Sequence, residues 1–193
     1  NLKQTELIRL AAGDFILSWV APKKIYLAEK PSARYQSGVW SLDITKKTIE
    51  PFIEAANGLT MRWDASGKVA LKFTNVFEDN TLVVVMGDGD TLALLPFATL
   101  PEKCVVVSVE PEISLYCAVP RSIREGTLLP DDYLTGAVRF SDDMVKWTLG
   151  GAVTRVYEGV GVPIDAEQLT AKNGKLRLVN RYDHKLYSID IGN

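Results

Sequence analysis

The sequence is poor in the residues from which catalytic and metal sites are most often built. Of its 193 residues, two are cysteine and one is histidine. A single histidine cannot form a metal site, and His184 lies in the polar segment 181–185, where a solvated turn residue is expected rather than a general base. Gly-x-Ser-x-Gly elbows, glycine-rich phosphate loops and zinc-type cysteine and histidine spacings are absent. The sequence therefore predicts no catalytic residue, no cofactor and no metal ligand.

The chain also lacks a basic block and a long apolar run. Its 22 Lys and Arg against 24 Asp and Glu give a net charge of −2, which argues against a nucleic-acid partner. The longest apolar runs, 82–86 and 104–107, are far shorter than the roughly 18–20 residues of a transmembrane helix, so we expect them to be strands. Because the chain starts at Asn1 without an initiator Met or an apolar leader, we expect a processed or truncated product.

Four segments of the chain share one plan, in which an apolar strand, a tight polar turn and a second apolar strand follow each other. The turns fall at 21–24, 65–68, 110–112 and 172–175. The last apolar residues before these turns are Trp19, Trp63, about Val107 and Leu169, at spacings of 44, about 44 and about 62 residues. A period in the low forties is typical of one four-stranded propeller blade, and a loop of about 18 residues inserted in the third unit explains the longer interval.

A second repeat supports the same architecture. Trp40-Ser41-Leu42-Asp43-Ile44 returns near the C-terminus as Tyr187-Ser188-Ile189-Asp190-Ile191. The sequence predicts a single all-β domain, a propeller-type array of about four four-stranded blades at 11–57, 58–102, 103–160 and 161–193. The stretch 47–53 is an expected outer strand, although 48–56 has some helical character, and Pro51 makes a short turn there more credible than a helix. A β-sandwich is the alternative fold.

At these residues the chain resembles the TolB-like and WD40-like propeller repeats of bacterial proteins. The family pattern is an aromatic residue, Ser-Pro-Asp-Gly-Lys and an apolar strand. Trp63-Asp64-Ala65-Ser66-Gly67-Lys68-Val69 keeps the aromatic residue, Gly67 and Lys68 but lacks the proline. The segments 99–104, 116–120 and 130–133 look like a branch of the same propellers. The resemblance implies a fold and no particular reaction.

Cys104 and Cys117 would face each other in a hairpin that turns at Glu110-Pro111. Facing positions allow a disulfide, whereas a register shift of one residue would leave two buried thiols on opposite faces. A disulfide, together with the resemblance to TolB-like envelope proteins, favours an extracytoplasmic location at the bacterial envelope.

Acidic pairs and tryptophans have ordinary structural explanations here. The pairs Asp131-Asp132 and Asp142-Asp143 flank the inserted loop, and Asp88 and Asp90 flank Gly89. Such acids could bind a cation or act as a glycosidase pair, but in surface turns they usually hydrogen-bond their own backbone. The four tryptophans stand at related points of the units, so we expect wedges between blades rather than a carbohydrate-stacking surface. They are Trp19, Trp40, Trp63 and Trp147.

The loop 121–143 is the best candidate for binding a partner. Long loops in compact β-proteins are usually functional, and exposed leucine and tyrosine beside charges can form the anchor and rim of an interface. The alternative is a loop that folds over the blade edge and covers it. The candidate contact residues are Arg121, Arg124, Leu128, Leu129, Asp131, Asp132 and Tyr133.

These features favour a non-catalytic protein-interaction scaffold with a protein partner. The alternative is the propeller portion of an enzyme such as a glycoside hydrolase or a serine peptidase. Because an open array exposes edge strands, we also expect either a homo-oligomer or further blades upstream.

Overall fold

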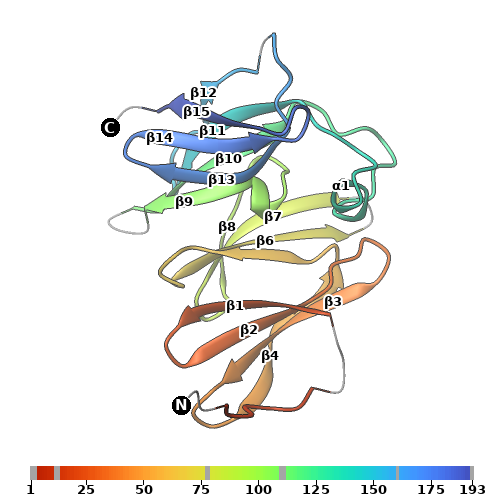
Figure 1. Cartoon of the computed structure of the whole chain (residues 1–193), viewed down its shortest axis with the longest axis vertical. Coiled ribbons are helices and arrows are strands. Elements are labelled where there is room, and N and C mark those ends of the chain that lie inside the picture. The colour runs from red at the N-terminus through yellow and green to blue at the C-terminus, as the bar shows by residue number, and fades with distance from the viewer. Residues whose placement is uncertain (1–3, 11–13, 77–78, 109–111, 160, 192–193) are drawn as a thin grey trace.

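The computed structural model describes residues 4–10, 14–76, 79–108, 112–159 and 161–191. In these residues the chain forms fifteen strands, the 3-10 turn η1 (Pro101–Lys103) and the single-turn helix α1 (Asp131–Leu134) (Figure 1). All strand pairs are antiparallel, and every strand pairs only with its neighbours in the sequence. The fold is all-β, as the sequence predicts.

The strands form four separate sheets, which we call A to D. Sheet A contains β1 (Phe15–Ala21), β2 (Lys24–Glu29), β3 (Gln36–Asp43) and β4 (Thr48–Asn57). Sheet B contains β5 (Thr60–Trp63), β6 (Val69–Val76), β7 (Asp79–Met86) and β8 (Thr91–Leu94). Sheet C contains β9 (Cys104–Ser108), β10 (Ser114–Pro120), β11 (Asp142–Thr148) and β12 (Thr154–Tyr157). Sheet D contains β13 (Ala166–Lys172), β14 (Lys175–Asn180) and β15 (Lys185–Asp190).

Local turn chemistry explains why the hairpins form where they do. Between β13 and β14, Asn173 and Gly174 both have positive φ, at 53° and 66°, which is the two-residue turn whose twist matches that of the strands. Between β5 and β6, the Asp64 carboxylate accepts hydrogen bonds from the backbone N–H groups of Ser66 at 2.7 Å and Val69 at 2.8 Å. The side chain of Asp64 thus closes a turn that a Ser-Gly pair alone would leave loose.

Segment 48–57 differs from one of our expectations. It forms the ten-residue strand β4, which confirms the outer strand expected at 47–53 and not the short turn. Pro51 is accommodated because β4 is the outermost strand of sheet A, where a missing N–H can face away from the ladder. The last sheet differs as well, because sheet D has three strands among the described residues rather than four.

The sheets stack face to face, and a hydrophobic cluster fills each space between consecutive sheets. Tyr26 and Val39 of sheet A pack with Leu59 ahead of sheet B. The largest cluster lies between sheets B and C, and a third joins sheets C and D. Four stacked sheets match a propeller-type array and not the two sheets of a sandwich.

The array is open. Sheet A lies at one end of the molecule and sheets C and D lie at the other (Figure 1). The two termini accordingly lie at opposite ends of the view. None of the described residues belongs to a helix long and apolar enough to cross a membrane.

Candidate functional site

The inserted loop connects β10 to β11 and carries α1, and it ties sheets that are far apart in the sequence. The Asp131 carboxylate accepts hydrogen bonds from the Ala33 N–H at 2.9 Å and the Ser32 hydroxyl at 3.3 Å, both in the β2–β3 connection of sheet A. On its other side, the loop reaches sheet D, where the Tyr133 hydroxyl donates to the Ala166 carbonyl at 3.4 Å. The loop therefore bridges the first and last sheets of the open array.

Our expectation of exposed apolar anchors in this loop is wrong for Leu129 and Tyr133. Both side chains are buried in the cluster between sheets B and C. The Leu129 carbonyl accepts a hydrogen bond from the Asn75 side chain at 3.1 Å, and the Tyr133 ring stacks on Phe140. This arrangement corresponds to the alternative explanation, in which the loop covers the sheets.

Of the remaining candidate residues of the loop, two are at least partly exposed and the others stabilise the loop through hydrogen bonds and an ion pair. Arg124 is exposed and Leu128 is half-buried. The Asp132 carboxylate accepts a hydrogen bond from the Leu128 N–H at 2.8 Å, and Arg121 pairs with Asp143 at 2.8 Å. Asp131, Asp132 and Arg121 thus hold the loop in place.

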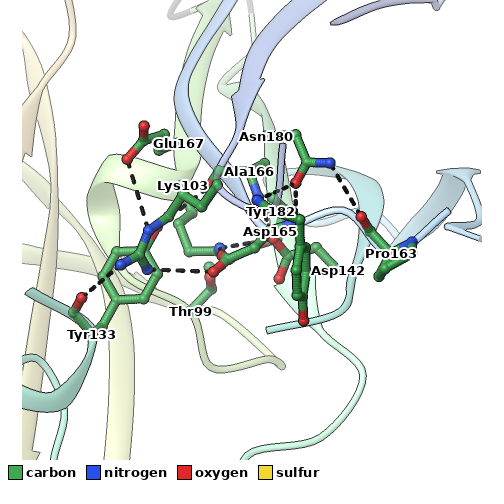
Figure 2. Close-up of polar contacts among 12 residues, drawn as sticks. Thr99, Lys103, Tyr133, Asp142, Pro163, Asp165, Ala166, Glu167, Asn180 and Tyr182 are labelled. Atoms are coloured by element: carbon green, nitrogen blue, oxygen red, sulfur yellow. Dashed lines mark hydrogen bonds and ion pairs between the residues drawn. The ribbon is translucent and has the colours of Figure 1, made fainter. Parts of the chain in front are cut away.

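A buried ionic cluster lies next to the loop, at Lys103 (Figure 2). The Lys103 ammonium lies 2.7 Å from the Asp142 carboxylate and 2.6 Å from that of Asp165, and all three side chains have 0% exposure. Tyr133 and Phe140 also border the ammonium, with ring centroids at 4.9 and 5.4 Å. Such a cluster holds η1, β11 and β13 in one arrangement.

Further hydrogen bonds fix the two carboxylates. The Ala166 N–H donates to Asp142 at 2.8 Å, and Arg181 lies 3.3 Å from Asp165. The Asn180 side chain accepts from the Asp165 N–H at 3.0 Å. The other Asp142 oxygen is buried without a hydrogen-bond partner. Burial raises the pKa of Asp142 to about 6, against the opposing effect of Lys103.

This cluster changes the interpretation of the acidic pairs. Asp142 is the partner of a buried lysine, and Asp143 pairs with Arg121 and, at 3.3 Å, with Arg155. Asp88 accepts a hydrogen bond from the Asp90 N–H within its own turn. Within the described ranges, no three His, Cys, Asp or Glu side chains gather as metal ligands would.

A cavity of about 720 Å³ opens at the centre of the array, between the first strands of sheets A, B and D. Its lining includes the apolar side chains of Tyr26, Met61 and Trp63. The Tyr26 and Trp63 rings stack with centroids 4.2 Å apart. The loop contributes Tyr133 and Leu134 to the same cavity. A pocket of this size with an aromatic wall is typical of a binding site.

Charged groups also line the cavity. The Arg62 guanidinium donates to the carbonyls of Glu102 at 2.9 Å, Cys104 at 2.8 Å and Leu169 at 3.1 Å, so it joins three sheets through one side chain. Burial lowers the pKa of Arg62 and raises the pKa of Glu102. One carboxylate oxygen of Glu102 is buried without a hydrogen-bond partner.

The strand β13 carries backbone strain at the cavity. Gln168 has φ of 54° at the bulge between Glu167 and Thr170, and all three residues line the cavity. A non-glycine residue in this region costs about 1–2 kcal/mol and is often found at functional sites. The bulge turns the Gln168 side chain out of the ladder.

The tryptophans do not share one role. Trp147 is buried in the core and Trp63 packs between sheets A and B, as expected of wedges. Trp40 is half-buried, whereas Trp19 is 66% exposed, so the wedge interpretation is wrong for Trp19. His184 is an exposed turn residue with φ of 56°.

Cys104 and Cys117 are directly opposite each other in the β9–β10 pair. Their sulfur atoms form a disulfide. Both residues are fully buried in the cluster between sheets B and C.

Sequence reasoning missed the charged residues that matter most at the centre. Lys103, Asp165, Arg62 and Arg181 stand in ordinary polar contexts along the chain. One signal was available in the sequence: Lys103 directly precedes the apolar run 104–107, and a lysine beside a buried strand is buried only when it has a charged partner.

Comparisons with known proteins identify the fold and not a family. No family profile and no curated protein matches the sequence. Among solved structures, the chain is similar to TolB from Acinetobacter baumannii, with a TM-score of 0.53 and 14% identity over 88% of this chain and 38% of that one. It is also similar to Kuenenia stuttgartiensis hydrazine synthase, with a TM-score of 0.58 and 14% identity over 89% and 51% of the two chains.

A third similar structure is the Pyrococcus horikoshii acylaminoacyl peptidase, with a TM-score of 0.53 and 14% identity over 90% and 31% of the two chains. The chain thus spans about a third to a half of the length of these proteins. At this identity the likeness supports a propeller-like fold alone.

Proposed function

We propose that this chain is a non-catalytic protein-interaction scaffold of the propeller type, and that its central cavity binds an extended peptide segment of a protein partner. The observation that carries the proposal is the cavity of about 720 Å³, whose lining combines aromatic and charged side chains. A peptide offers both kinds of group, because apolar side chains can pack on the Tyr26–Trp63 stack while its backbone meets polar groups.

Two features at the cavity support binding over a purely structural role. Gln168 holds a strained backbone conformation where its side chain is exposed beside the cavity. Leu134 of the loop is 55% exposed and also lines the cavity. The inserted loop therefore takes part through its inner side, while Arg124 and Leu128 lie outside the proposed contact.

The test uses a phage-displayed library of random peptides as the probe. Selected peptides are measured against the wild type and against Leu134→Asp and Thr170→Glu, which change exposed cavity residues. We expect at least a tenfold loss of affinity in both variants. The matched controls Leu92→Asp and Leu94→Asp change exposed leucines of β8 and should bind like the wild type. Selected peptides that bind all four variants equally would place the site elsewhere.

The competing function is the propeller portion of an enzyme, such as a glycoside hydrolase or a serine peptidase. Glu102 and Glu167 both line the cavity, and a carboxylate pair is the usual machinery of glycoside hydrolysis. A panel of chromogenic glycosides and peptide esters separates the two functions. Turnover by the wild type that is lost in Glu102→Gln or Glu167→Gln would overturn the non-catalytic proposal.

We place the protein outside the bacterial cytoplasm, at the cell envelope. The Cys104–Cys117 disulfide supports this location, because such bonds persist in oxidising compartments. Thiol alkylation of acid-quenched cells should leave both cysteines unmodified. Two alkylated cysteines in the protein from its native host would contradict the location.

A further inference from the structure

The face of sheet A directed away from sheet B, which we call the outer face of sheet A, exposes large apolar side chains. Along β1, Ile16 and Ser18 line the cavity and Val20 packs on the core between sheets A and B. Because side chains alternate along a strand, Leu17 and Trp19 point to the opposite side. Each of them is 66% exposed.

The outer face carries two adjacent apolar rows that cross the sheet. One row follows the strand pairs from Leu17 on β1 to Leu27 on β2, then to Trp40 on β3 and Pro51 on β4. A second row across the same face consists of Ile25, Leu42 and Ile49. An antiparallel sheet with one solvated face places polar residues on that face, so two adjacent apolar rows on the outer face indicate a face that is covered in the assembled protein.

The described residues cover only part of this face. Leu27 and Leu42 are buried. The segment 4–10 runs along this side of sheet A (Figure 1), where the Glu6 carbonyl accepts a hydrogen bond from Lys47 at 3.2 Å. Leu17 and Trp19 remain uncovered.

The opposite end of the array has a different surface. On the outer face of sheet D, Lys175 pairs with Asp190 at 2.6 Å, and Val179 and Leu186 are the apolar members. The polar residues of that face away from the cavity are Lys172, Lys175, Arg177, Ser188 and Asp190. Stacking the two ends head to tail would desolvate these charges against leucine and tryptophan, at a net cost.

We propose that two copies of this chain associate through the outer faces of sheet A about a two-fold axis, with Leu17 and Trp19 of each copy in the contact. A second copy presents an apolar sheet of the same twist, and two such sheets pack face to face about 10 Å apart. An isologous contact of this kind closes on itself as a dimer and leaves the polar outer face of sheet D in water.

The size of the face sets the expected strength. Four strands of about eight residues cover roughly 19 by 26 Å, which is less than the ~800 Å² that each partner buries in a standard interface. We therefore expect a reversible dimer with a micromolar dissociation constant rather than an obligate one.

Sedimentation velocity over concentrations from low micromolar to several hundred micromolar tests the proposal. We expect the wild type to move from monomer to dimer, and the double variant Leu17→Ser with Trp19→Ser to stay monomeric. Both side chains are exposed, so circular dichroism should remain that of the wild type. The single variant Leu17→Lys keeps Trp19 and gives a second test if the double variant does not fold.

The matched controls are Leu186→Ser and Leu94→Ser, whose side chains are 71% and 65% exposed on sheets D and B. Both controls should dimerise like the wild type. A wild type that stays monomeric throughout would overturn the proposal, as would a dimer that survives Leu17→Lys. Loss of the dimer in Leu186→Ser, or growth into longer oligomers, would instead indicate a head-to-tail contact.

Discussion

Replacing Lys103 with Met should destabilise the protein more than any surface change of the same kind. The substitution keeps most of the side-chain length but leaves Asp142 and Asp165 as buried carboxylates without the ammonium between them. Breaking a buried ion pair by removing one partner costs about 3–5 kcal/mol. For a chain of 193 residues, this corresponds to a fall in the melting temperature of about 6–20 °C.

The structure supplies a matched control for this experiment. Lys175 lies 2.6 Å from Asp190, which is the distance between Lys103 and Asp165, but these side chains are 45% and 79% exposed. Lys175→Met should therefore cost less than about 1 kcal/mol. Urea denaturation and differential scanning calorimetry of both variants measure the difference. Comparable losses in Lys103→Met and Lys175→Met would refute the argument that burial decides the strength of the pair.

A compensating variant distinguishes charge from packing. Adding Asp142→Asn to Lys103→Met removes one of the uncompensated carboxylates, so part of the lost stability should return. If the double variant is no more stable than Lys103→Met, the lysine acts through its packing against Tyr133 and Phe140 and not through its charge.

Three further predictions follow from the same contacts. The pKa of Asp142 is raised to about 6 from an ordinary 3.8, so between these values the folded protein retains a proton that the unfolded chain releases. The contribution of Asp142 to the free energy of unfolding therefore falls as pH rises from about 4 to about 6. In Asp142→Asn, the free energy of unfolding measured by urea denaturation should depend less on pH across that range. Replacing Cys104 and Cys117 with Ala removes a disulfide with a sequence separation of 13 and should lower the free energy of unfolding by about 3 kcal/mol. The wild type measured in reducing agent should lose the same amount if the bond itself is responsible. Gln168→Gly relieves the strain of a positive φ and should raise the free energy of unfolding by about 1–2 kcal/mol, while the selected peptides should bind more weakly. A destabilised variant would show that the backbone at Gln168 is not strained.

Local information in the sequence was enough to predict the elements and their repetition. The Asn173-Gly174 turn and the alternating runs around it identify the β13–β14 hairpin because they depend only on neighbouring residues. The spacing of about 44 residues and the longer third interval likewise located the inserted loop, which lies between β10 and β11 as expected. The outer strand expected at 47–53 is present as β4, whereas the short turn suggested by Pro51 is not, because the effect of a proline depends on whether its strand lies at the edge of the sheet.

The centre of the molecule was decided by the tertiary structure alone. Lys103, Asp142 and Asp165 are up to 62 residues apart in the chain, and only the stacking of sheets C and D brings their charges together in a buried space. The exposure of Trp19 and the burial of Tyr133 depend in the same way on which sheet has a neighbour. The alternation of apolar residues along a strand predicts on which face of the strand each side chain lies. Whether that face is buried depends on contacts between residues far apart in the chain.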